Sequence, residues 1–122
     1  MSNEKTFYVS ELYEDILNYA KLGADTKALE IGVGYGQATY PILETGADVL
    51  AIDKNADFVA YVAEKFAENK NFKAETVKFE DLEAEAGSFD FIYSAIKRSF
   101  FNTTIDIHHL SSSAYYKVSI II

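Results

Sequence analysis

The feature that most constrains this chain is an apolar run that ends in three glycines at alternating positions. Residues 28–36 read Ala-Leu-Glu-Ile-Gly-Val-Gly-Tyr-Gly, with one acid, Glu30, inside the run. The apolar residues predict a short buried strand, and the glycines predict a turn too tight for side chains. Glycine tolerates a positive φ and lets a ligand touch the backbone, and a helix after the turn would aim free N–H groups at that ligand. The stretch therefore predicts a small-molecule site of the nucleotide-binding kind.

Apolar strands and amphipathic helices alternate along the chain. The expected strands cover 27–32, 48–53, 72–79 and 88–95, the expected helices cover 8–22, 38–45 and 56–68, and a turn or short helix is expected at 80–83. Repeated alternation of this kind predicts a parallel sheet with right-handed crossovers. We expect the strand order third, second, first, fourth, with the helices at 38–45 and 56–68 on one face and the helix at 8–22 on the other. The fold class is therefore α/β with a doubly wound parallel sheet.

An acid ends the second of these strands. Asp53 lies about twenty residues beyond the first glycine, the spacing at which a dinucleotide-binding fold places an acid on the ribose hydroxyls. The alternative is that Asp53 caps the helix that follows it, because Asp is a good N-cap residue. Both functions are compatible with the sequence.

Four segments together resemble class I S-adenosylmethionine-dependent methyltransferases. Residues 30–36 resemble the first motif of that family, 49–53 the second, 79–82 the third, and 87–95 the fourth strand with its lead-in. The motifs stand in the family's order and at its spacing, and the resemblance covers residues 8 to 95 approximately. It implies a Rossmann-like fold, S-adenosyl-L-methionine as the cofactor, and methyl transfer as the activity.

The resemblance also implies which residues bind the cofactor. The glycine turn would hold the methionine part, Asp53 the ribose, and Glu80 or Asp81 the adenine edge. The full predicted set is Glu30, Gly32, Gly34, Gly36, Asp53, Glu80, Asp81 and Ser94. No catalytic residue is nominated, because methyl transfer needs little beyond holding donor and acceptor in line.

The chain departs from the family pattern at both ends. Residues 7–10 read Phe-Tyr-Val-Ser where Arg-Pro and Tyr-Pro are expected, and the apolar, His-containing stretch expected after Ala95 is replaced by Ile-Lys-Arg-Ser. We therefore expect a sheet that is incomplete at its C-terminal side, with a cofactor-binding domain at 1–95 and a divergent tail at 96–122 that forms no domain of its own. A truncated or frame-shifted gene product is one hypothesis for this change. The β-prone residues 115–122 are the candidate to pair with the exposed fourth strand, and a homodimer through that edge is the alternative.

Composition argues against several classes of partner and site. With 11 basic and 19 acidic residues the formal charge is −8, which argues against a broad nucleic-acid footprint, although a local basic patch would still allow RNA binding. No apolar run is long enough for a membrane span, and residues 1–5 do not resemble a signal peptide. The absence of cysteine excludes disulfides and thiolate metal sites and fits a cytoplasmic protein. No metal is expected at His108 and His109, because neighbouring side chains point apart on a strand.

Three functions from different classes stay open. The favoured interpretation is a methyl-transferring enzyme, or the cofactor-binding half of one, acting on an acceptor that the residues do not specify. A nicotinamide-dependent oxidoreductase is disfavoured, because Gln37 stands where its fingerprint requires a third glycine and Glu30 has no function in it. The third is a protein that keeps the fold without catalysis and serves as a binding partner.

Overall fold

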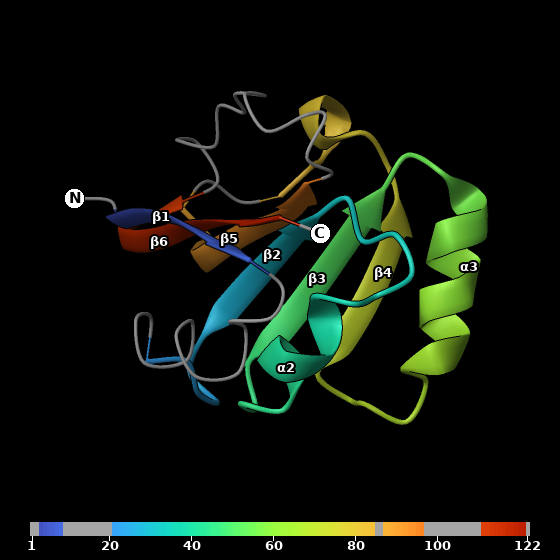
Figure 1. The fold of residues 1–122 in the computed structure, drawn as a ribbon, viewed down its shortest axis with the longest axis horizontal. Coiled ribbons are helices and arrows are strands. Elements are labelled where there is room, and N and C mark those ends of the chain that lie inside the picture. Colours follow the sequence, from blue (N-terminus) through green and yellow to red (C-terminus); the bar gives the residue numbers. More distant parts are fainter. Residues whose placement is uncertain (1–2, 9–20, 85–86, 97–110, 122) are drawn as a thin grey trace.

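The structure, a computed structural model, describes residues 3–8, 21–84, 87–96 and 111–121 (Figure 1). These residues build one sheet of six strands in the order β1-β6-β5-β2-β3-β4, in which every pair is parallel. The strands are β1 (Asn3–Tyr8), β2 (Lys27–Ile31), β3 (Asp48–Asp53), β4 (Phe72–Thr76), β5 (Phe89–Ile96) and β6 (Ser111–Ile121). The helical elements within the described ranges are α2 (Thr39–Leu43), α3 (Ala56–Lys65) and the 3-10 turn η3 (Phe79–Asp81).

The predicted order of the four central strands is confirmed. β2 lies between β3 and β5, and Ala28 is level with Val49 on one side and with Phe91 on the other. β4 continues the sheet beyond β3. This is the Rossmann-like arrangement, with strands apolar on both faces because both faces are covered.

The core has two layers, one on each face of the sheet. Both helices pack on the first face, as predicted: Ile42 and Leu43 of α2, and Val62 of α3 with Phe66 just beyond its end, join alternate strand residues in one buried cluster. The strand residues of that cluster are Ala28, Val49, Ala51, Phe72, Phe91 and Tyr93. The second face buries Leu29, Ile52, Leu82, Phe89 and Ile92. Each strand thus contributes side chains to both layers, because successive side chains of a strand point to opposite faces of the sheet.

The C-terminal segment supplies a strand of the same sheet. β6 pairs in parallel with β5, from Phe91 opposite Tyr116 to Ile96 opposite Ile121, so the predicted pairing of the tail with the fourth strand is confirmed. β1 then pairs with the other side of β6. β6 therefore covers the edge of β5, which was the edge that a second copy of the chain would have paired with in the homodimer alternative.

The prediction of a helix at 8–22 is wrong at both ends of that range. Tyr8 is the last residue of β1, where it pairs with Ile121, and Lys21 has a φ of 51°, outside the helical region. The rest of that expected helix, at 9–20, lies outside the described residues. The free edge of β6 explains the difference at Tyr8, because an extended segment there gains a complete parallel ladder.

Three other elements are shorter than predicted. The helix expected at 56–68 ends at Lys65, with Phe66 as its C-cap. β4 ends at Thr76 instead of residue 79, since its partner β3 ends at Asp53 and the ladder closes with the hydrogen bond from Val77 N to the Asp53 carbonyl (3.0 Å). The helix expected at 38–45 is regular only over Thr39–Leu43. Its third residue is Pro41, which is tolerated because the first four helical N–H groups have no partner within the helix. Among the described residues, no helix has the length and apolarity needed to cross a membrane.

Candidate ligand-binding site

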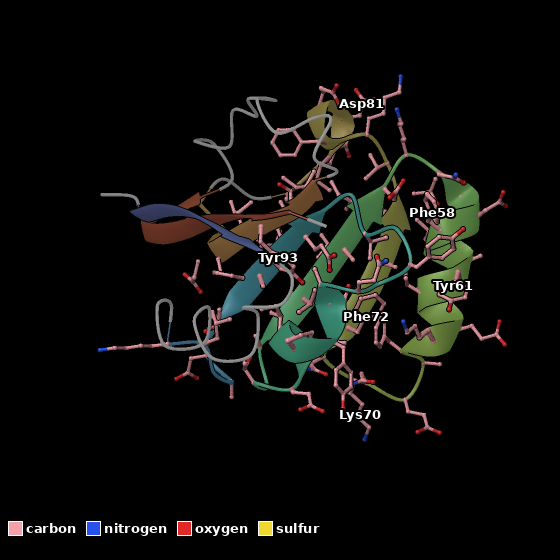
Figure 2. All side chains as sticks on the ribbon, in the orientation of Figure 1. Phe58, Tyr61, Lys70, Phe72, Asp81 and Tyr93 are labelled. Atoms are coloured by element: carbon pink, nitrogen blue, oxygen red, sulfur yellow. The ribbon has the colours of Figure 1, made fainter. Side chains whose placement is uncertain are left out.

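The predicted site residues gather at the carboxyl edge of the sheet. Gly32 directly follows β2, Asp53 is the last residue of β3, and Ser94 of β5 is level with Ile31 at the end of β2. Glu80 and Asp81 are exposed residues of η3, which follows β4 beyond the same edge (Figure 2). In open α/β sheets this edge is where ligands bind.

The glycine turn, residues 32–36, leaves the end of β2 with its backbone open on one side. Gly32, Gly34 and Gly36 have φ values of 77°, 54° and 84°, a region that L side chains rarely adopt. The N–H groups of Gly32 and Val33 both donate to the Ile52 carbonyl, at 2.9 and 3.1 Å, which fixes the start of the turn against β3. A Cβ placed on Gly32 or Gly34 would meet nothing within 4 Å. These two glycines therefore leave room for a ligand.

Gly36 has a different physical environment. It is buried, and a Cβ there would lie 2.8 Å from the Phe66 ring and 3.3 Å from a methyl of Val62. The missing side chain lets the turn pack closely against α3 and the residue that follows it. The structure thus gives Gly36 a packing function within the turn.

Asp53 connects the glycine turn to the start of α3. Its Oδ2 accepts a hydrogen bond from Gly34 N at 3.2 Å, and its Oδ1 accepts one from Asn55 N at 2.9 Å. The capping alternative for Asp53 is wrong, because the N-cap of α3 is Asn55, whose side chain accepts from Asp57 N at 2.9 Å. Each carboxylate oxygen has two lone pairs, so both oxygens of Asp53 can accept a further hydrogen bond from a ligand.

Glu30 is a fully buried acid directly beneath this edge. Its Oε1 accepts hydrogen bonds from the Thr39 hydroxyl at 2.5 Å and from the Tyr93 hydroxyl at 2.8 Å. Its Oε2 has no hydrogen-bond partner among the described residues. Burial, with a smaller contribution from the charge of Asp53, raises the pKa of Glu30 from 4.5 to about 7, although both hydrogen bonds oppose the shift.

Two residues of this buried group were not predicted. Thr39 begins α2, and Tyr93 lies on β5 opposite Glu30. Burial and the neighbouring Glu30 carboxyl raise the pKa of Tyr93 well above its usual value, so Tyr93 is a hydrogen-bond donor at neutral pH. A buried acid requires hydrogen-bond donors, but only the pairing register shows that Tyr93 supplies one.

The described part of the chain holds no group of three or more His, Asp or Glu side chains that could bind a metal ion. His108 and His109 lie outside the described residues. The groups that the described residues present at this edge are backbone N–H groups of the turn, the carboxyl groups of Glu30, Asp53, Glu80 and Asp81, and hydroxyls.

Comparison with known proteins identifies a matching family and several relatives. The family described as a methyltransferase domain matches residues 28–114. A chloroplastic ribosomal RNA small subunit methyltransferase of Arabidopsis thaliana is 41% identical over 66 residues, which are 51% of this chain and 19% of that protein. An rRNA adenine N-6-methyltransferase of Bacillus licheniformis is 29% identical over 72 residues, 59% of this chain and 25% of that protein. The chain thus spans a quarter or less of the length of these two relatives.

The fold is also that of a solved structure. A SAM-dependent methyltransferase from Aquifex aeolicus superposes with a TM-score of 0.72 at 20% identity. The match covers 88% of this chain and 64% of that one. At this level of identity the match shows a common fold.

Proposed function

Because this chain belongs to the methyltransferase-domain family, we propose that it binds S-adenosylmethionine at the carboxyl edge of β2 and β3 and uses it as a methyl donor. The observation that carries the proposal is the pair of open glycines, Gly32 and Gly34, beside the carboxylate of Asp53. A ligand that needs close backbone contact and also carries vicinal hydroxyls fits this arrangement. The cofactor supplies an electrophilic methyl group on a sulfonium.

The predicted residues divide the parts of the cofactor among them in this proposal. Gly32 and Gly34 let the methionine part approach the backbone, and Asp53 accepts from the ribose hydroxyls while it keeps its hydrogen bond to Gly34. Glu80 or Asp81 on η3 binds the adenine edge, and Ser94 borders the site from β5.

Glu30 contributes through its second carboxylate oxygen. Oε2 is buried and lacks a partner among the residues that the structure describes, which is the kind of atom that a cationic ligand group satisfies. The ammonium of the methionine part has that chemistry. We therefore assign Glu30 to charge recognition beneath the glycine turn, and Gly36 to holding the turn against Phe66.

Titration calorimetry with S-adenosylhomocysteine, the demethylated product, tests the cofactor assignment, with NAD titrated in parallel. We expect the parent chain to bind the first and not the second. Gly34→Val should abolish binding, because its side chain fills the space that the ligand requires. Gly46→Val is the matched control: Gly46 also has a positive φ, of 90°, but precedes β3 at the amino edge of the sheet.

The control should keep the parent's affinity, since it also places a side chain at a positive φ but lies remote from the glycine turn. Binding of NAD in place of S-adenosylhomocysteine would refute the methyltransferase proposal. Equal loss of binding in both glycine variants would mean that strain, and not the space above Gly34, determines affinity.

RNA is the first acceptor class to assay, because the two curated relatives are rRNA methyltransferases by name. The formal charge of −8 argues that any RNA contact is local. Transfer of labelled methyl from the cofactor to total RNA, sensitive to ribonuclease, would assign that class. Absence of label in RNA, with label in a small-molecule extract, would exclude it.

A further inference from the structure

The outer side of the glycine turn is held by side chains of α3. The Lys65 ammonium donates a hydrogen bond to the Tyr35 carbonyl at 3.0 Å. The Tyr35 ring packs edge to face on Phe58, with centroids 4.9 Å apart, and on Tyr61, at 5.3 Å. Phe58 and Tyr61 are labelled on α3 in Figure 2. We call Tyr35, Phe58, Tyr61 and Lys65 the Tyr35 clamp.

The three helix residues of the clamp occupy one face of α3. Positions 58, 61 and 65 are spaced by three and four, so their side chains lie in one row along the helix. The Lys65 ammonium also lies 5.7 Å from the centroid of the Tyr61 ring and 5.4 Å from that of Phe66. Two aromatic rings thus favour the position from which Lys65 reaches the turn.

Burial alone does not account for this contact. Tyr35 remains 55% exposed and Tyr61 48% exposed, so much of each ring surface still faces water. The clamp instead uses directional contacts, namely a charge-assisted hydrogen bond and two perpendicular ring pairs. Directional contacts restrict the conformation of the segment that they hold.

Consecutive residues of the turn are therefore fixed by different neighbours. Asp53 accepts from Gly34 N, the clamp holds Tyr35, and Phe66 packs on Gly36. A glycine-rich turn without these contacts would sample many conformations, and ordering it would reduce the affinity for a ligand.

We propose that α3 positions the glycine turn for its ligand through the Tyr35 clamp, and that Lys65 is a positioning residue that need not touch the ligand. This inference rests on the proposed function for the identity of the ligand. The turn is pre-organised from its outer side, which leaves the side above Gly32 and Gly34 open.

Lys65→Met tests the proposal, because methionine keeps an apolar stem beside Tyr61 and removes the donor. Affinity for S-adenosylhomocysteine should fall about three- to ten-fold, the loss that corresponds to one hydrogen bond of ordinary net strength. Lys65→Arg restores a donor and should restore affinity. Lys70→Met removes the same charge from an exposed residue beyond the end of α3 and should bind like the parent.

Amide hydrogen exchange of the ligand-free chain tests the clamp without any ligand. The amides of Gly34 and Gly36 are hydrogen bonded, to Asp53 Oδ2 and to the Val33 carbonyl (3.0 Å), so their protection is measurable. Lys65→Met should accelerate exchange at these two amides and leave the Val49 amide of β3 unchanged. A merely structural loss would change all three together.

Unchanged exchange at Gly34 and Gly36 in Lys65→Met would overturn the inference, as would a loss of affinity that Lys65→Arg does not restore. Failure of the parent to bind S-adenosylhomocysteine would instead refute the proposed function. In that case the exchange measurement alone still decides whether the clamp orders the turn.

Discussion

Replacing Glu30 by Gln should change how stability depends on pH. In the parent, burial raises the pKa of Glu30 from 4.5 to about 7, so the folded chain holds this proton more tightly than the unfolded chain. Between these two values the folded state binds more protons at this site, and the free energy of unfolding falls as pH rises. The loss is complete above about pH 7, where both states are ionised. Below about pH 4.5 Glu30 is protonated in both states, so it adds no pH dependence to the free energy of unfolding.

The magnitude follows from the two pKa values. Each pH unit between them corresponds to about 1.4 kcal/mol, so the parent should lose about 3 kcal/mol at this site. Full burial of Glu30 means that solvent screens little of this effect. Glu30→Gln has no charge to bury, and its carbonyl oxygen can still accept from Thr39 and Tyr93.

Urea unfolding of both proteins from pH 4.5 to pH 8 measures the effect. The quantity to compare is the free energy of unfolding of Glu30→Gln minus that of the parent, in which the titration of all other groups cancels. This difference should rise by about 3 kcal/mol across the range. Tyr93→Phe removes a hydrogen bond that lowers the pKa of Glu30, and should move the upper end of the transition to higher pH. A flat difference, or one that falls with pH, would show that Glu30 is ionised at little cost in the folded chain.

Two further pairs of variants separate functions within the site. Asp53→Asn should weaken binding of S-adenosylhomocysteine at least about ten-fold, because a hydrogen bond to a charged acceptor contributes roughly 1.5–3 kcal/mol. Asn55→Ala should instead cost about 1 kcal/mol of stability through loss of the α3 cap, with affinity unchanged in calorimetry; equal loss of affinity in both would contradict the ribose assignment. Gly36→Ala should destabilise the chain by about 1–3 kcal/mol more than Gly32→Ala, because its methyl group meets the Phe66 ring. Equal unfolding midpoints for the two alanine variants would disprove the packing function of Gly36.

The central strands and their order could be predicted because they depend on local patterns. The apolar run at 48–53 gives β3 with the expected bounds, and the glycines after Ile31 end β2 where the backbone requires positive φ. The alternation of strands and helices, together with right-handed crossovers, leaves few topologies. Residues at the carboxyl ends of parallel strands then share one edge, which is why Gly32 and Asp53 were expected together.

The N-terminal segment shows where a local pattern misleads. Apolar residues at helical spacing led to a helix starting at Tyr8, yet residues 3–8 form β1. Its partner β6 comes from the other end of the chain, with Asn3 opposite Tyr116. The sequence of residues 3–8 contains no information about a partner strand more than a hundred residues away. The pairing with β6 therefore overrides the local helical preference at Tyr8.

The sequence alone was enough to predict which residues reach the carboxyl edge. The apolar runs, the glycines after Ile31 and the acid at residue 53 mark the ends of the strands, and strand ends depend on the local backbone. The contacts that each residue makes there came from the tertiary structure alone. It separated Gly36, packed on Phe66, from the open Gly32 and Gly34, and it gave the α3 cap to Asn55 and left Asp53 to hold the turn. It also placed Tyr93 against Glu30, 63 residues apart. These functions depend on distances between segments remote in sequence, which a one-dimensional pattern does not contain.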